Sequence, residues 1–180
     1  VGKEHIPPAS PSDRIVLVCN HISELDPMFL EMGQRRQIFF MAKEELFRSR
    51  IGRWFFGRQL GAFPVKRGKG DSSAIDNARA VVESGRIMGI FPEGTRSRNG
   101  QLGRFKSGAA LIVSQTGASV LPACVVAPGQ QVKPFRRCKL VFGPLIPPEE
   151  LHLQDPENPD LRYATRYLAE RIECMIEENR

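Results

Sequence analysis

The sequence lacks any long hydrophobic run. Nowhere in its 180 residues do apolar side chains continue for the roughly 18 positions that a membrane-spanning helix needs, and no signal peptide is visible. The chain as given is therefore not expected to cross a membrane. It opens on Val1 instead of methionine, so we expect that upstream residues are missing and that they could include a membrane anchor.

The sequence also lacks the spacings of a metal site or a disulfide framework. Its cysteines are scattered without a CxxC pair, which predicts reduced thiols in a cytosolic protein and no bound metal. One of them, at position 19, adjoins the first motif described below. A cysteine inside an apolar strand is predicted to pack rather than to act as a nucleophile. The four are Cys19, Cys124, Cys138 and Cys174.

Recognisable nucleic-acid-binding patterns are absent as well, although the chain is basic. It carries 26 Lys and Arg against 20 Asp and Glu, a net charge of +6. Such an excess favours anionic partners, which could be nucleic acid, acidic lipid surfaces or phosphorylated substrates. Because the sequence contains no helix-turn-helix, RNP or zinc-finger pattern, we expect no nucleic acid partner.

Predicted strands and helices alternate along the chain. Hydrophobic residues make up 41% of it, which suits one globular domain spanning residues 1–180. The alternation predicts a layered α/β fold. Strands are predicted at 15–18, 38–41, 60–65, 87–91, 120–126 and 139–142, and helices from 27 and at 43–59, 72–83, 106–115 and 160–177.

A histidine followed five positions later by an aspartate stands at the end of the first predicted strand. Asp26 precedes Pro27, which favours a helix start with Asp26 as its N-cap. On a continuous helix His21 and Asp26 would lie about 140° apart, but across a turn they can meet. A carboxylate that accepts one N–H of an imidazole fixes its tautomer and stabilises the imidazolium. The pair predicts a general base; the alternative is a capping aspartate beside an ordinary loop histidine.

Residues 48–69 combine basic and aromatic side chains and contain no acid. Such a mixture fits a surface that lies on anionic lipid headgroups. The alternative is a helix that packs into the core and leaves its arginines in water. The basic residues are Arg48, Arg50, Arg53, Arg58, Lys66, Arg67 and Lys69, and the aromatic ones are Trp54, Phe55, Phe56 and Phe63.

Two further polar segments follow predicted strands. Lys66 and Arg67 come directly after the third strand, and the glycine-rich loop 92–100 follows the fourth. Functional loops of α/β folds gather at the carboxyl ends of their strands. We therefore expect both segments to meet His21 at one edge of the sheet.

Four short motifs resemble the signatures of the glycerolipid acyltransferase family. They stand in the family's order with typical spacing and cover residues 1–127. Each motif alone is weak, but their combination makes the resemblance specific. The motifs are NHISELDP at 20–27, GAFPVKR at 61–67, FPEGTRS at 91–97 and VLPA at 120–123.

The resemblance implies a layered mixed β-sheet flanked by helices. It also implies an enzyme that moves a fatty acyl group from an acyl thioester, acyl-coenzyme A or acyl carrier protein, to the sn-2 hydroxyl of lysophosphatidic acid. The product would be phosphatidic acid, made at the cytoplasmic face of an anionic membrane without a further cofactor. The protein would be peripheral or anchored by an upstream segment. Glycerol 3-phosphate or another lysolipid as acceptor remains open, as does a basic membrane-binding module without turnover.

The resemblance also implies roles for the motif residues. His21 would take the proton of the acceptor hydroxyl, with Asp26 orienting its imidazole. A phosphate carries about −1.5 to −2 charge, so more than one cation is expected, and arginine matches its oxygens bidentately. Glu93 would hold the glycerol hydroxyl or an arginine. The acceptor-binding residues expected are Arg67 and Arg96, then Lys66 and Arg98, with Glu93, Gly94 and Thr95; Lys43 and Lys106 are further cations that could join them.

Overall fold

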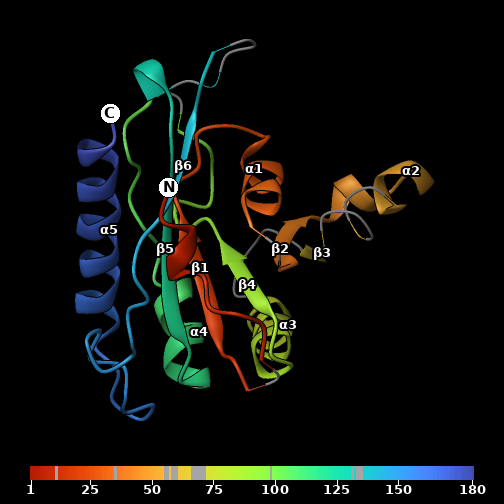
Figure 1. The fold of residues 1–180 in the computed structure, drawn as a ribbon. Coiled ribbons are helices and arrows are strands. Elements are labelled where there is room, and N and C mark those ends of the chain that lie inside the picture. Colours follow the sequence, from red (N-terminus) through yellow and green to blue (C-terminus); the bar gives the residue numbers. More distant parts are fainter. Residues whose placement is uncertain are drawn as a thin grey trace.

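The protein folds around one six-stranded sheet with the strand order β3-β2-β4-β1-β5-β6 (Figure 1). Five strands run parallel, and β6 runs antiparallel to β5. The expected layered, mixed α/β fold is thereby confirmed. The strands are β1 (Ile15–Cys19), β2 (Ile38–Lys43), β3 (Ala62–Val65), β4 (Ile87–Ile90), β5 (Ser119–Val126) and β6 (Lys139–Phe142).

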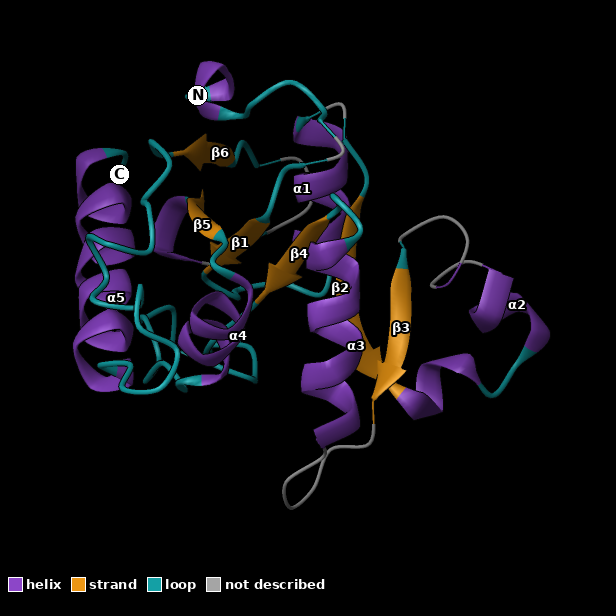
Figure 2. Cartoon of the chain, turned by 90° about the horizontal axis from the view of Figure 1, so that it is seen from below, coloured by secondary structure: helices purple, strands orange, loops and turns teal. Residues whose placement is uncertain are grey.

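The chain is represented by a computed structural model that describes residues 1–10, 12–34, 36–54, 57, 61–65, 72–97, 99–130, 132 and 136–180. In Figure 2, helices α3, α4 and α5 cover one face of the sheet, and α1 lies on the other face with the N-terminal segment. The helices are α1 (Asp26–Gly33), α2 (Arg50–Gly52), α3 (Ser72–Glu83), α4 (Gly108–Thr116) and α5 (Leu161–Glu178), with 3-10 turns η1 (Lys3–His5), η2 (Glu44–Phe47) and η4 (Pro128–Gln130).

Strand β1 lies in the middle of the sheet and is buried along its whole length. Its side chains alternate between two cores: Val16 and Val18 pack with the helices α3, α4 and α5, while Leu17 packs on the side of α1. Parallel strands covered on both faces are expected to be continuously apolar in this way. Val18 pairs with Ile90 of β4, so the loops that follow β1 and β4 leave the sheet side by side.

A buried asparagine fixes the point at which the chain leaves β1. Asn20 Nδ2 donates to the carbonyl of Val125 at 3.0 Å, and the N–H of Val125 donates to Asn20 Oδ1 at 2.8 Å. The side-chain amide therefore continues the pairing between β1 and β5 after the strand has ended. The backbone carbonyl and N–H of Val125 are thus both satisfied by the side chain of Asn20. This fixes the backbone at Asn20 and therefore the position of His21, which follows it.

The helix expected at 43–59 is wrong as a continuous element. Strand β2 runs to Lys43, η2 follows, and Ser49 starts a new short helix by accepting a hydrogen bond from the N–H of Gly52 at 2.8 Å. Pairing with two neighbouring strands and a new cap outweigh the helical spacing of the apolar residues. Residues 44–54, called the arm below, project beyond β3 in Figure 1; residues 55, 56 and 58–60 lie outside the described residues.

Candidate active site

His21 and Asp26 meet, as their spacing between strand and helix predicted. His21 Nδ1 lies 2.8 Å from Asp26 Oδ2. The aspartate side chain is fully buried, while the imidazole remains 17% exposed. Because the carboxylate can only accept, Nδ1 carries the proton of this bond and Nε2 keeps its lone pair. The arrangement leaves one ring nitrogen able to take a proton from a ligand.

The carboxylate of Asp26 also holds the turn that precedes it. Its Oδ2 accepts from the N–H of Ile22 at 2.7 Å and from the N–H of Ser23 at 2.8 Å. The expectation that Asp26 caps its helix is wrong, because Asp26 is the first residue of α1 and Leu25 occupies the N-cap position. A capping carboxylate would bind N–H groups further along its own helix, whereas this one fixes the loop that carries the imidazole.

An aromatic stack covers the imidazole. The rings of His21 and Phe91 lie 4.2 Å apart at an angle of 20°, and Phe91 stacks in turn on Phe40 at 5.6 Å. Gly89 on β4 leaves the space that Phe40 fills, since a Cβ there would lie 2.3 Å from its ring. One face of the imidazole is thereby shielded from water and its orientation is fixed from a second side.

Glu93 connects the histidine loop to the loop that follows β4 by two hydrogen bonds. Its Oε1 accepts from the N–H of His21 at 2.7 Å, and its Oε2 accepts from the N–H of Gly103 at 2.7 Å. Burial raises the pKa of this carboxyl above its ordinary value, while the two N–H bonds lower it. Each oxygen binds a backbone N–H, so Glu93 holds the histidine loop in place. A carboxylate oxygen can accept more than one hydrogen bond, so the expected contact with a glycerol hydroxyl or an arginine stays a prediction.

The loop after β4 docks directly on the histidine segment. The N–H of Ser97 donates to the carbonyl of His21 at 2.8 Å. Gly94 adopts a positive φ of 71°, and a Cβ at this position would lie 2.8 Å from Lys106 Nζ. A glycine is therefore required by both backbone conformation and space, and the ammonium of Lys106 stands next to the loop.

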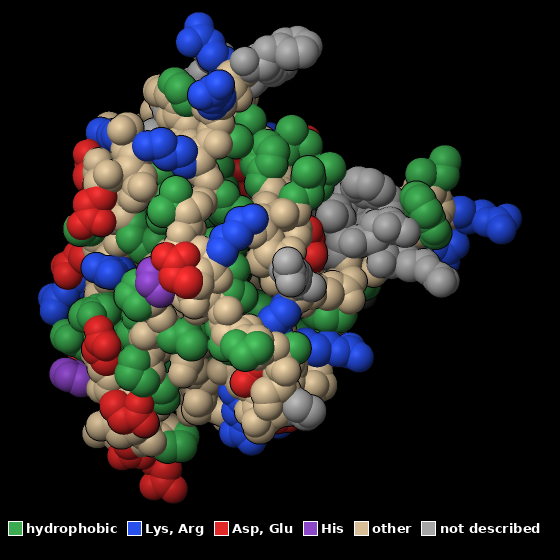
Figure 3. Space-filling view, viewed as in Figure 1, with side chains coloured by type: hydrophobic (Ala, Val, Ile, Leu, Met, Phe, Trp, Pro, Cys, Tyr) green, Lys and Arg blue, Asp and Glu red, His purple; other side chains and the backbone are tan. Residues whose placement is uncertain are grey.

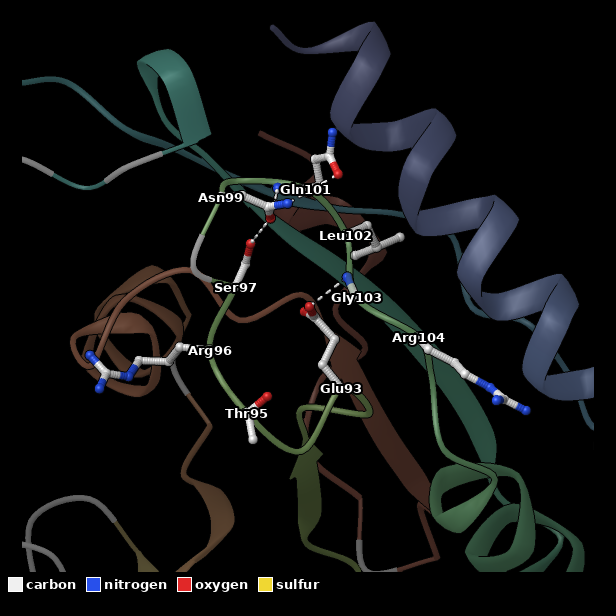
Figure 4. A pocket seen from close by; sticks show the side chains of 9 residues that line it. All are labelled: Glu93, Thr95, Arg96, Ser97, Asn99, Gln101, Leu102, Gly103 and Arg104. Atoms are coloured by element: carbon white, nitrogen blue, oxygen red, sulfur yellow. Dashed lines mark hydrogen bonds between the residues drawn. The ribbon is translucent and has the colours of Figure 1, made fainter.

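Part of this loop lines an open cavity of about 400 Å³ (Figure 4). Arg96 is 52% exposed and makes an ion pair with Glu24 at 3.0 Å; Thr95 is also exposed. In Figure 4 the side chains of Arg96 and Arg104 extend in opposite directions. The cavity is lined by Glu93, Thr95, Arg96, Ser97, Asn99, Gln101, Leu102, Gly103 and Arg104.

The structure therefore brings His21, Asp26 and the 93–97 segment to one edge of the sheet. Lys66, Arg67 and Arg98 lie outside the described residues, as does the side chain of Lys43. Among the described residues, no group of three or more His, Cys, Asp or Glu side chains is placed to hold a metal ion. The cations beside the site could instead hold an anion.

Cys19 is completely buried, and burial raises the pKa of its thiol well above the ordinary value. A buried thiol with a raised pKa is a poor nucleophile, which agrees with the packing role expected from the sequence.

Several residues that shape the site carried no functional prediction. Asn20 belongs to the first motif, and Phe91 to the third, but neither spacing nor composition showed what they contact. Gly103 lies outside the motifs altogether. The one signal in the sequence was the position of Asn20 directly after an apolar strand. An amide at such a position is expected to be buried, and a buried amide needs hydrogen-bond partners.

A histidine base with a buried aspartate, set at the carboxyl edge of a parallel sheet beside a basic loop, indicates an α/β enzyme that takes a proton from its substrate. Comparison with known proteins gives the family. The chain belongs to the acyltransferase family, whose sequence profile, described as Acyltransferase, matches residues 1–126.

Individual relatives carry more specific names. A "1-acyl-sn-glycerol-3-phosphate acyltransferase" of Bacillus subtilis is 34% identical over 176 residues, which are 95% of this chain and 84% of the relative. A protein of the same name from Streptococcus pneumoniae is 35% identical over 64% of this chain, which matches 43% of that protein. The crystal structure of the "1-acyl-sn-glycerophosphate (LPA) acyltransferase, PlsC" of Thermotoga maritima shares the fold, with a TM-score of 0.74 at 24% identity over 99% of this chain and 70% of its own.

Proposed function

We propose that the protein transfers a fatty acyl group from an acyl thioester to the sn-2 hydroxyl of lysophosphatidic acid and so makes phosphatidic acid for phospholipid synthesis. The observation that carries the proposal is the bond between His21 Nδ1 and the buried Asp26, which leaves Nε2 as a base. The names of the relatives support this acceptor. Acyl-coenzyme A or acyl carrier protein is the proposed donor, and no further cofactor is required by the reaction.

In the proposed mechanism Nε2 of His21 takes the proton of the acceptor hydroxyl while the oxygen attacks the thioester carbonyl. Asp26 stabilises the imidazolium that forms and holds the ring in place. The carbon–sulfur bond then breaks, and the thiolate leaves with the electron pair and receives the proton. Because a thiolate is a good leaving group, no strong general acid is needed, and direct attack needs no covalent acyl-enzyme.

The phosphate of the acceptor is proposed to bind at the loop after β4. Arg96 offers an exposed guanidinium there, and its surface ion pair with Glu24 contributes little, so that a phosphate can replace the carboxylate. Gly94, Thr95 and Glu93 are proposed to contact the acceptor beside it. Lys66 and Arg67 are proposed to complete the positive charge. Glycerol 3-phosphate and other lysolipids would use the same cations, so they remain alternative acceptors.

The proposed place of the reaction is the anionic cytoplasmic face of a membrane, where the protein is peripheral or held by a segment upstream of residue 1. Within the described ranges no helix combines the length and the apolar character needed to span a bilayer. The basic composition of the chain supports an anionic surface as a partner, and no nucleic acid partner is proposed.

The substitution His21→Ala tests the proposal. Loss of a general base lowers the rate by about 10²- to 10⁴-fold, whereas affinity for lysophosphatidic acid should change little. The measurement is the mass-resolved yield of acylated product from an acyl thioester and a panel of lysolipids, with acceptor binding followed separately by calorimetry.

His152→Asn is the matched control, because His152 stacks on Tyr163 at 4.2 Å on the turn before α5 and adopts a φ of 55° that asparagine tolerates. This variant should keep the wild-type rate. Equal rates of the wild type and His21→Ala would contradict the proposal, and wild-type protein that binds lipid without acylating any acceptor would favour the binding-module alternative.

A further inference from the structure

The arm exposes large apolar side chains to solvent. Ile51 is 79% exposed and Trp54 56%, while Leu46 at the start of the arm is 41% exposed. In Figure 3 the arm projects from the body of the molecule with apolar and basic side chains at its tip. The core-packing interpretation of this segment is therefore wrong for Ile51 and Trp54, whose side chains do not pack into either core cluster.

Basic side chains surround these apolar ones. Arg48, Arg50 and Arg53 are all exposed, and no acid occurs between Arg48 and Trp54. Two acids, Glu44 and Glu45, are exposed at the base of the arm in η2. The outer part of the arm thus combines positive charge with apolar side chains, which is the composition of segments that lie at the boundary between lipid headgroups and acyl chains.

Exposed apolar side chains also flank the proposed active site. Helix α1 contacts β2, the strand from which the arm extends, and its Met32 is 79% exposed. Leu25, directly before Asp26, is 46% exposed. Exposed apolar side chains therefore occur both on the arm, which continues from the end of β2, and on α1, which contacts β2. Helix α1 begins at the aspartate that holds the histidine.

From these contacts we propose that the arm and the outer side of α1 form a docking surface for an anionic bilayer, with Ile51 and Trp54 inserted among the acyl chains and the three arginines at the headgroups. The proposal rests on the proposed function in one respect: an acceptor held in the bilayer would reach His21 along α1 without leaving the lipid. An acidic protein would pair with the arginines but offers no reason for the exposure of Ile51 and Trp54, so a bilayer is favoured as the occupant.

Trp54 is the only tryptophan in the chain, so its fluorescence reports directly on the arm. The wild-type protein is mixed with phosphatidylglycerol vesicles, with and without brominated acyl chains, and with phosphatidylcholine vesicles. We expect a blue shift with phosphatidylglycerol, quenching by the brominated chains, and a much weaker response to phosphatidylcholine. Sedimentation with the vesicles without a change in emission would overturn the proposal, because another surface would then be bound.

Charge-removing variants test whether the arginines of the arm bind the vesicles. A basic residue near an anionic surface strengthens binding roughly fivefold, so Arg48→Gln, Arg50→Gln and Arg53→Gln together should weaken vesicle binding on the order of a hundredfold. The control removes three exposed arginines of the α5 region with Arg162→Gln, Arg166→Gln and Arg180→Gln. Both triple variants lose the same net charge. An equal loss of binding in the two would overturn the proposal, because net charge alone would then explain it.

A second pair of variants tests insertion. Ile51→Ala with Trp54→Ala should weaken sedimentation with phosphatidylglycerol vesicles at least tenfold, since most of the apolar contact is lost. Leu145→Ala removes an apolar side chain that is 37% exposed elsewhere on the molecule and should leave binding unchanged. Unchanged binding of the double variant, with a thermal unfolding midpoint equal to that of the wild type, would overturn the inserted geometry.

The activity assay separates this proposal from the proposed function. The arm variants should lose turnover of a long-chain lysophosphatidic acid held in vesicles but keep turnover of a short-chain, monomeric acceptor. If no acceptor is acylated by the wild type, the proposed function fails while the vesicle experiments still judge the surface. If the arm variants bind vesicles normally and lose only turnover with acyl carrier protein, the surface docks an acidic protein and the bilayer proposal is overturned.

Discussion

At the scale of the residue, the site depends on a few backbone contacts made by side chains. The Glu93 carboxylate spans the N–H groups of His21 and Gly103, and the Asp26 carboxylate spans the turn after His21. Both acids therefore fix the backbone that carries the imidazole. Arg96 differs from these two acids, because its guanidinium is half exposed beside the cavity and can contact a ligand.

Glu93→Gln should lower kcat by about 10- to 100-fold without raising the acceptor KM, because the amide presents an NH₂ group to one of two N–H donors and displaces the histidine loop. Gly103→Ala should have the same effect, since its Cβ would lie 2.6 Å from Glu93 Oε2. Steady-state kinetics of both variants provide the measurement. Gly108→Ala is the control, because a Cβ there meets nothing within 4 Å.

A rise in the acceptor KM of Glu93→Gln at unchanged kcat would contradict the positioning role and favour a direct contact with the substrate. Thermal unfolding of each variant shows whether a lower kcat reflects a displaced loop in a folded protein or loss of the fold.

Arg96→Ala should raise the KM for lysophosphatidic acid about 10-fold or more, because a hydrogen bond to a charged group contributes roughly 1.5–3 kcal/mol. The donor KM should change much less. Arg79→Ala is a matched control, since Arg79 is also exposed and forms a surface ion pair, with Glu83 on α3. Equal effects of Arg96→Ala on both substrates would argue against a phosphate contact.

At the scale of the element, α1 braces the chain at both of its ends. Its first residue, Asp26, holds the histidine loop, and Glu31 near its other end accepts from the N–H of Ile38, the first residue of β2, at 2.8 Å. Burial raises the pKa of Glu31 to about 7, against an ordinary value of 4.5. The start of β2 is thus tied to a carboxyl group that titrates near neutral pH.

The raised pKa predicts how stability depends on pH. Between about pH 4.5 and 7 the folded state keeps a proton on Glu31 that the unfolded state releases, so this group lowers the free energy of unfolding as pH rises through that window. After allowance for solvent screening the loss is on the order of 1 kcal/mol, or about 2–4 °C in Tm.

Glu31→Gln should remove this loss while its amide oxygen still accepts from Ile38. Relative to the wild type, the variant should therefore gain stability on going from pH 5 to pH 8, as measured by thermal unfolding at both values. Glu173→Gln, at an exposed position on α5, is the control. A difference between variant and wild type that does not change with pH would contradict the assignment.

At the scale of the whole molecule, the sheet separates two buried cores, one on each face. The candidate active site lies at the carboxyl ends of its parallel strands. Cys19 and Cys124 are buried in these cores, whereas Cys138 and Cys174 are exposed. Burial raises the pKa of Cys124 to about 12, and a hydrogen bond to Glu178 raises the pKa of Cys174. Thiol reactivity should therefore follow the architecture of the molecule.

A maleimide added to the folded protein should modify Cys138, modify Cys174 more slowly, and leave Cys19 and Cys124 unmodified until the protein unfolds. Peptide mass mapping over time measures the order, and the labelled protein should keep its acyltransfer rate because neither exposed thiol lies at the site. Rapid labelling of Cys19 with loss of activity would instead favour an acyl-cysteine intermediate.

The amino-acid sequence alone predicted the order of strands and helices, the meeting of His21 with Asp26, and the gathering of the histidine loop and the 93–97 loop at one edge. These follow from local rules: apolar runs form buried strands, proline favours the start of a helix, and parallel strands end at a common edge. The helix at 43–59 failed because strand pairing overrode the spacing of its apolar residues, and spacing cannot show whether such residues are buried.

The partners of the polar side chains, in contrast, are set by the three-dimensional arrangement of the strands. Asn20 binds Val125, which lies 105 positions later in the chain, and Glu93 binds His21, which lies 72 positions earlier. No local sequence pattern contains both members of either pair. The same holds for the stack of Phe91 on His21, which needs Gly89 and Phe40 on neighbouring strands. A sequence motif specifies which chemical groups are present, but the distance and direction between them arise only when the strands are placed side by side.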